Sequence, residues 1–245
     1  MLTRATPFEF RHRFWFILSA FVLAFLSYRW DHVNTALALV KVVSGRALDL
    51  DSLVARHRLQ AAFGISAALV SAAAWMRTWG SAYLRAEVVF DSKVHSERLV
   101  ADGPFRHVRN PLYFGNVLLA AGIGLLTSRV GWFILVGGMS FFVRRLIGYE
   151  ESALSATQGE SYRAYFASVP RLWLSLTPRF PAGGTSPQWL KAFFGEAWMW
   201  YFSGAGVFLA ATLDFREYNH IVWATPALLL LRWAVLARFR RRRPG

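Results

Sequence analysis

The sequence contains no cysteine and few acidic residues, and each shortage excludes some chemistry. Without cysteine the chain can form no disulfide, no thiolate nucleophile and no cysteine metal site, and we expect no metal. Only 14 aspartates and glutamates stand against 28 lysines and arginines, which gives a formal net charge of +14. Because the basic residues flank apolar stretches, membrane topology and anionic lipid explain this charge better than a nucleic-acid partner does.

We also expect no secretory signal, because the apolar stretch that begins at Phe14 has no small-residue cleavage site after it. Instead, 55% of the residues are hydrophobic, and they gather into runs that approach the roughly 17–25 residues needed to cross a bilayer. Helices satisfy their own backbone in lipid. The sequence therefore predicts an all-α, polytopic membrane helix bundle with about six transmembrane helices, at 14–30, 59–79, 112–128, 130–147, 196–213 (starting at Glu196 or Ala197) and 220–237.

The spans divide the chain into three parts, 1–80, 81–180 and 181–245, and the middle part carries the features typical of a site. Residues 35–43 are apolar but too short to cross, so we expect an interfacial or re-entrant segment there. The spans 112–128 and 130–147 predict a tight central hairpin. After it, 148–195 is polar and amphipathic, with Tyr162, Tyr165 and Phe166 on one helix face, and we expect Gly159 to interrupt that helix.

Lysine and arginine concentrate in one set of loops: 1–13, 80–111, 144–195 and the tail 238–243. By the positive-inside rule, both termini and the middle part's polar segments face the cytoplasm. By analogy, we expect the membrane to be a prokaryotic inner membrane. Membrane lipids are expected partners, and the basic tail is expected to be an anchor to anionic lipid.

The most informative stretch is 101–128, where a basic loop meets an apolar helix. Asp102-Gly103-Pro104 is turn chemistry, and Arg106, His107 and Arg109 follow within a few positions. Pro111 suits the first turn of a helix, where its missing N–H costs nothing. The free N–H groups and positive dipole end of that helix point at the loop, so the sequence predicts a place to hold an anionic part of a small molecule.

Two adjacent carboxylates should lie near this loop. The hairpin returns the chain to the side it left, so Glu150 and Glu151 should approach Arg106 and Arg109. Paired acids at a membrane boundary are costly unless they are solvated or paired. Two interpretations remain open: an interfacial salt-bridge cluster, or a polar pocket for a zwitterionic cofactor.

The run from Gly103 to Gly115 resembles the GP[YF]R…R[HN]PxYxG signature of isoprenylcysteine carboxyl methyltransferases, which the wider group that includes phospholipid methyltransferases shares. A second block, Glu150-Glu151 followed by Gly159, Tyr162, Tyr165 and Val169-Pro170-Arg171, resembles the EE…G..Y..Y…VP pattern of the same family. The resemblance covers about residues 75–175. It departs at Asn110, where the family often has histidine, and this argues against a role there that needs an imidazole.

This resemblance implies S-adenosylmethionine as the cofactor and a lipophilic methyl acceptor that enters from the bilayer. Arg109 or Arg171 would suit the cofactor's carboxylate, Glu150 or Glu151 its ammonium, and the tyrosine faces its adenine and sulfonium. The implied cofactor-binding residues are Arg106, His107, Asn110, Pro111, Tyr113, Gly115, Gly122, Gly124, Glu150, Tyr162, Tyr165 and Arg171. For the hairpin glycines, close helix packing is the equally favoured interpretation.

Arg109 and Glu151 are the candidate catalytic residues. A carboxylate acceptor is already ionised and would need only an arginine to position it, whereas an amine would have to lose a proton, for which Glu151 is the available base. His107 could also serve, although a lone histidine in a basic loop is more often a surface donor. The acceptor stays open between an isoprenylcysteine-type carboxylate and a phospholipid amine. Two other classes also remain: an NADPH-dependent sterol-type membrane reductase and a non-enzymatic membrane scaffold.

Overall fold

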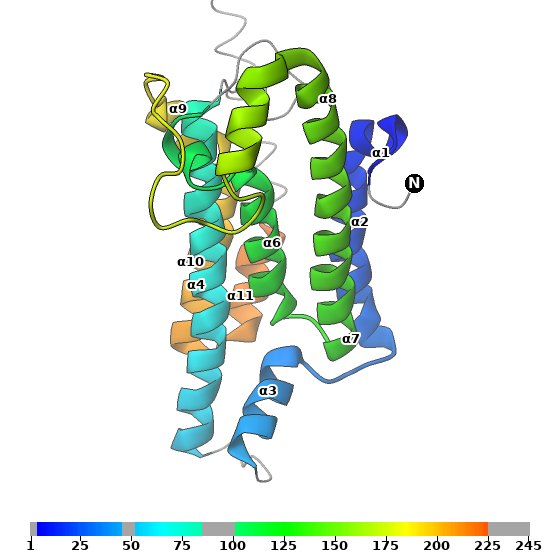
Figure 1. Ribbon diagram of the computed structural model, residues 1–245. Helices are drawn as coiled ribbons and strands as arrows, with labels where there is room; N and C mark the ends of the chain where they lie inside the picture. Colours follow the sequence, from blue (N-terminus) through cyan, green and yellow to red (C-terminus); the bar gives the residue numbers. More distant parts are fainter. Residues whose placement is uncertain (1–3, 46–51, 85–100, 225–245) are drawn as a thin grey trace, which may run out of the picture.

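The computed structural model describes residues 4–45, 52–84 and 101–224, and over these residues it confirms an all-helical chain without a β-strand (Figure 1). In chain order the elements are α1 (Pro7–Arg11), α2 (Arg13–Leu26), η1 (Ser27–Arg29), α3 (Thr35–Ser44), α4 (Leu53–Tyr83), η2 (Gly103–Arg106), α6 (Pro111–Gly124), α7 (Arg129–Trp132), η3 (Phe133–Gly137), α8 (Gly138–Ser168), α9 (Trp189–Gly195), α10 (Ala197–Thr212) and α11 (Phe215–Trp223).

Within the described ranges, two helices are long and apolar enough to cross a membrane. They are α4, with 31 residues, and the helix Arg129–Thr157, with 29, which runs through α7 and η3 into α8. By contrast, α2 and α6 have 14 residues each and α10 has 16. At 1.5 Å per residue these cover about 21–24 Å, less than the ~30 Å hydrocarbon core. The predicted count of six spans is therefore not established, and most of the sixth lies outside the described residues.

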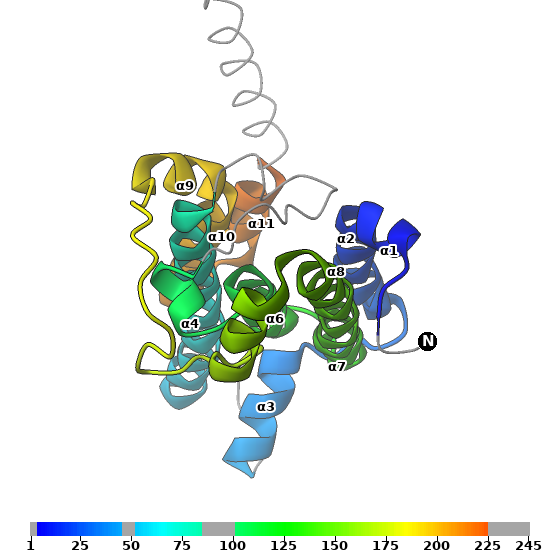
Figure 2. The ribbon, with the colours of Figure 1, turned by 45° about the horizontal axis from the view of Figure 1, so that its top comes forward.

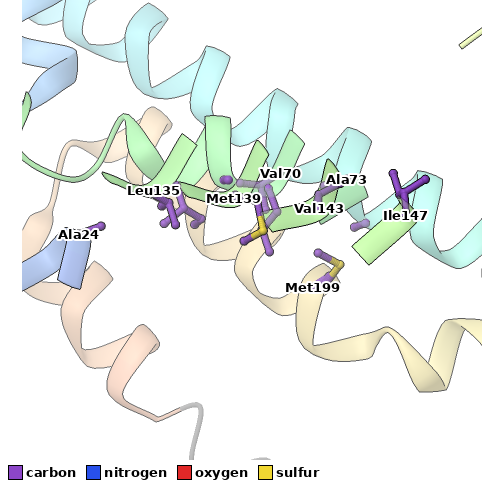
Figure 3. Close-up of a cluster of buried hydrophobic side chains, with 12 residues drawn as sticks. Ala24, Val70, Ala73, Leu135, Met139, Val143, Ile147 and Met199 are labelled. Carbon is purple, nitrogen blue, oxygen red and sulfur yellow. The ribbon is translucent and has the colours of Figure 1, made fainter. Parts of the chain in front are cut away.

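Helix α4 packs along both α6 and α10, and α6 lies between α4 and α8 (Figures 1 and 2). Small residues allow the close approach: a Cβ on Gly122 of α6 would lie 2.8 Å from Cγ2 of Val70 on α4. At the same crossing, the Ser66 hydroxyl donates a hydrogen bond to the Gly122 carbonyl, at 2.7 Å. Figure 3 shows the buried cluster that joins these helices to α2 and α8, with Ala24, Val70, Ala73, Leu135, Met139, Val143, Ile147 and Met199 labelled.

The predicted hairpin is present and its turn is fixed by polar contacts. Ser128 caps the second helix by accepting a hydrogen bond from the Gly131 N–H, at 3.0 Å. Asp31, in the linker after α2, accepts from Nη2 of Arg129 at 2.8 Å and from the Val130 N–H at 3.1 Å. The linker and the hairpin turn thus hold each other at the end of the bundle away from α1 (Figure 1).

At the opposite end, α8 turns over at Gly159 and its last residues run back along the bundle (Figure 1). Gly159 has φ 57° and ψ −133°, a conformation that L side chains rarely adopt. The turn returns Tyr162 and Tyr165 to the loop before α6, where they are buried with Ala101 and Val169. The expected interruption of this helix at glycine is therefore present, and it positions the second motif block over the first.

Replacing Gly159 with alanine should destabilise the protein by about 1–3 kcal/mol, because a Cβ strains this backbone even though the space around it is open. The matched control is Gly204→Ala in α10, an exposed helical glycine with no positive φ and no atom within 4 Å of the point that a Cβ would occupy. That change should be neutral or stabilising. Thermal unfolding of both variants in detergent tests this, and equal shifts for the two would contradict it.

The Asp31–Arg129 contact should make stability depend on acidic pH. The hydrogen bond from Arg129 lowers the pKa of Asp31 from 3.8 to about 2. Because the folded pKa lies below the unfolded one, the stabilisation is complete above pH ~4 and is lost as the pH falls toward about 2. The melting temperature of wild type should therefore exceed that of Asp31→Asn at neutral pH, and the two should converge over this acidic window. A difference that does not change with pH would refute the assignment.

Candidate active site

Gly103 and Asp102 determine the shape of the loop before α6. Gly103 has φ 55°, and a Cβ there would overlap the ring of Tyr83. Asp102 accepts hydrogen bonds from the N–H groups of Gly183 and Thr185, at 2.6 and 2.8 Å. Burial raises the pKa of Asp102, but these hydrogen bonds outweigh it and leave the pKa below its ordinary value. The loop is thus tied to the segment that follows α8.

Arg106 and His107, both predicted to bind cofactor, instead hold that following segment. Nε of Arg106 donates to the Phe180 carbonyl at 2.7 Å, and Nδ1 of His107 is 2.8 Å from the Ser175 carbonyl. Backbone bonds reinforce both contacts, since the Ser175 N–H donates to the His107 carbonyl at 3.0 Å. A cavity of about 500 Å³ opens beside Glu151, and neither side chain lines it. Their position is that of structural anchors for residues 175–180.

Arg109, Glu151 and Arg171 form the central cluster. Nη2 of Arg109 is 3.1 Å from Oε1 of Glu151, and Nη2 of Arg171 is 2.8 Å from Oε2. Both oxygens of the carboxylate are therefore paired, and the Glu151 side chain is only 9% exposed. Nη1 of Arg109 also donates to the carbonyls of Phe166 and Val169, at the end of α8. The structure thus brings together the two candidate catalytic residues and one predicted cofactor-binding residue.

Glu150 faces a different neighbour. Its Oε1 accepts a hydrogen bond from the Tyr113 hydroxyl of α6, at 2.7 Å. Successive helical residues point about 100° apart, so Glu150 and Glu151 diverge from α8 although they are adjacent in sequence. Glu150 is therefore linked to the loop region through α6, and Glu151 is linked to it directly.

The two tyrosines of the second motif are packing residues in this structure. Tyr162 and Tyr165 are 2% and 3% exposed, and burial raises the pKa of both phenols. The Tyr165 hydroxyl donates to the Phe105 carbonyl at 2.8 Å, which fastens the returning part of α8 to η2. The aromatic ring that reaches the cavity is Phe166, and the Arg109 guanidinium lies 4.0 Å from its centroid. Helical periodicity predicts one shared face for Phe166 and the two tyrosines, but Phe166 is exposed whereas they are buried. Periodicity also gives no reason to select Phe166 as a site residue.

The remaining predicted residues shape α6. Nδ2 of Asn110 donates to the Arg171 carbonyl at 3.0 Å, and Pro111 begins the helix. A Cβ on Gly115 would lie 2.5 Å from Cγ of Arg77. Gly122 packs on α4, and a Cβ on Gly124 would lie 2.9 Å from the Trp132 ring. The structure does not bring these three glycines to the cavity, and each permits a close helix contact.

A cavity of about 500 Å³ opens beside the central cluster. Among the residues that the structure describes, its charged lining consists of one carboxylate, that of Glu151, and the four arginines Arg4, Arg109, Arg144 and Arg171. Nε of Arg171 is buried and has no hydrogen-bond acceptor among the described residues. The volume falls within the range of small-molecule sites, and the lining suits a ligand that carries at least one carboxylate or phosphate.

Sequence reasoning missed a second ion pair, between Arg77 of α4 and Glu196 at the start of α10. Nε and Nη2 of Arg77 each donate to a different oxygen of Glu196, both at 2.9 Å, and Nη1 donates to Asn116 of α6 at 2.9 Å. The Glu196 side chain is 1% exposed, and Ser81 supplies a further hydrogen bond to it. An arginine inside an apolar span is itself a signal that a buried partner exists, but 119 residues separate the two in sequence.

Residues 61–161 match the family model of phospholipid methyltransferases. This segment is similar to the isoprenylcysteine and phospholipid methyltransferase-like family. The resemblance predicted from the two motifs is thereby confirmed. The match to this family supports the activity of a membrane methyltransferase with a lipid-related role. Neither a curated protein nor a solved structure matches the chain.

The methyltransferase-like segment runs from α4 to just beyond Gly159, so it includes Arg77, Arg109 and Glu151. It excludes Arg171 and Glu196, which supply one partner in each of the two ion-pair clusters. The segment therefore depends on residues outside the match to complete its buried electrostatics.

Replacing Glu196 with glutamine should destabilise the protein by about 3–5 kcal/mol, because it leaves the Arg77 charge buried without a counterion. The double variant Arg77→Met/Glu196→Met should be less destabilised than Glu196→Gln, since it removes both charges. Glu217→Gln on exposed α11 is the control and should change little. Thermal unfolding in detergent measures all three. A double variant that is less stable than Glu196→Gln would argue against this interpretation.

Proposed function

We propose that the chain is an integral membrane, S-adenosylmethionine-dependent methyltransferase that acts on a lipophilic acceptor. The observation that carries this proposal is the Arg109–Glu151–Arg171 cluster beside a cavity of about 500 Å³, with two of the three residues inside the family-matched segment. The same cluster lies at one end of the helix Arg129–Thr157, which is long enough to span a bilayer. We place this end at the cytoplasmic surface, where a water-soluble cofactor is available.

Two residues fit the methyl donor best. Arg171 offers a buried Nε without an acceptor among the described residues, and a cofactor carboxylate would satisfy it. Glu151 lines the same cavity and would attract the ammonium group. When bound, S-adenosylmethionine supplies an activated methyl group. Arg109 then acts as a positioning residue, since its guanidinium already holds Glu151, Phe166 and Val169.

The cavity favours an acceptor that needs no deprotonation. Glu151 is its only carboxylate among the described lining residues, and two arginines engage both of its oxygens. If this carboxylate attracts the ammonium of the donor, the described lining offers no second carboxylate to act as a base for an amine acceptor. Histidine is also missing from the described lining. We therefore favour methylation of a carboxylate, of the isoprenylcysteine type, over methylation of a phospholipid amine.

Arg171→Gln and Glu151→Gln should each weaken S-adenosylmethionine binding by roughly tenfold or more, because each removes a charged contact to the donor. Arg163→Gln is the matched control, since Arg163 is an exposed arginine of the same helix as Glu151. Equilibrium dialysis of the full chain against radiolabelled S-adenosylmethionine measures this.

A parallel dialysis against NADPH separates the proposal from the reductase alternative. Preferential NADPH binding, or no binding of either cofactor, would overturn the methyltransferase assignment. Mass spectrometry of lipid and small-acid extracts, incubated with the protein and methyl-labelled donor, should show the label on a lipophilic acid. Label on an amine would instead support the phospholipid alternative.

A further inference from the structure

Two arginines of the cavity have no counterion among the described residues. Glu151 is already shared between Arg109 and Arg171. The side chains of Arg4 and Arg144 are exposed, and neither makes a hydrogen bond or ion pair with another described residue, although both line the same cavity. Like charges gathered at one cavity repel one another unless an anion lies between them. The cavity therefore has room and charge for an anionic ligand beyond the protein's own carboxylate.

Arg4 is held at this place by the short helix that follows it. The Ala5 N–H donates to the Arg145 carbonyl at 2.9 Å, and Glu9 pairs with the Arg145 side chain at 2.7 Å. Phe10 is buried, and its ring stacks on Tyr149 with centroids 4.7 Å apart. Figure 1 shows α1 beside the part of α8 that precedes its bend. Chain termini are ordered only when such contacts hold them, so the contacts fix Arg4 at the cavity.

The methyl donor cannot supply the missing charge. It carries one carboxylate against an ammonium and a sulfonium, so its net charge is positive. Placing it beside four arginines and one glutamate would add to the excess of positive charge. This step rests on the proposed function, because it assumes that the donor occupies this cavity. The anion must then come from the second ligand.

We propose that Arg4 and Arg144 form an oxyanion site that binds the carboxylate or phosphate of an anionic amphiphile, the methyl acceptor. The site is built by the N-terminal segment, which lies outside the family-matched residues 61–161, together with the first part of α8. Binding of this anion lowers the repulsion in the cavity, so it also strengthens binding of the positively charged donor. Acceptor and donor binding are therefore positively coupled.

The test measures binding of dodecanoate and dodecyl phosphate to the full chain in phosphatidylcholine nanodiscs, with empty nanodiscs subtracted. Arg4→Gln and Arg144→Gln should each weaken binding of at least one probe by roughly tenfold. The matched control is Arg11→Gln. Arg11 is an exposed arginine of α1, the helix that follows Arg4, and it does not line the cavity. That variant should bind as wild type does, and thermal unfolding checks that all three fold.

Acetate and inorganic phosphate distinguish the source of the anion. Acetate and inorganic phosphate should fail to displace the amphiphile at concentrations at which the amphiphile saturates the site, because the site is proposed to take a lipid-like headgroup. Displacement by these ions as effective as by the amphiphile itself would overturn the amphiphile assignment. The site itself would be overturned if Arg11→Gln lost as much probe affinity as the other two variants, or if Arg4→Gln and Arg144→Gln lost none. These probes bind without a donor, so failure of S-adenosylmethionine binding would refute the proposed function while leaving the anion site measurable. With the donor present, dodecanoate should tighten donor binding several-fold in wild type and not in Arg4→Gln.

Discussion

The pairing of one carboxylate, Glu151, with Arg109 and Arg171 is the constraint on which the site depends. It joins three segments that are distant in sequence: the loop before α6, the body of α8 and the chain after α8. Removing a carboxylate from water is costly unless both oxygens are paired, and here both are. Arg109 adds a second restraint by donating to carbonyls at the end of α8, where the helix dipole favours a cation.

Arginine serves two different purposes in this fold, and the contrast explains where a ligand would bind. Arg77 lies inside the bundle and its charge is matched by Glu196, so that network joins α4, α6 and α10 without attracting an ion. At the cavity, by contrast, the arginines outnumber the acid. Only the second arrangement leaves an excess of positive charge that would attract an anion.

Much of the helical order could be predicted from the sequence, because apolar runs, Pro111 and Gly159 mark helix boundaries by local physics. The approach of the acids to the loop also followed from topology, since a hairpin must return to its starting side. The directions of the side chains could not be predicted in the same way. Glu150 and Glu151 diverge by one helical step, and Tyr162 and Tyr165 turn inward after a bend whose angle the sequence does not specify. The Arg77–Glu196 pair depends on packing between helices far apart in the chain.

The boundaries of the family match acquire a physical meaning when they are compared with these contacts. Residues 61–161 contain the helices and the motif residues, yet the counterion of Arg77 and the second partner of Glu151 both lie beyond residue 161. A buried charge without its partner is strongly destabilising. The matched segment alone would leave Arg77 in that state, whereas Glu151 would keep Arg109 and lose only its second arginine. The α10 helix and the chain after α8 therefore complete the ion pairs of the matched segment, and the N-terminal segment adds Arg4 to the wall of the cavity. The parts of this chain that lie outside the family pattern complete the electrostatics of the part inside it.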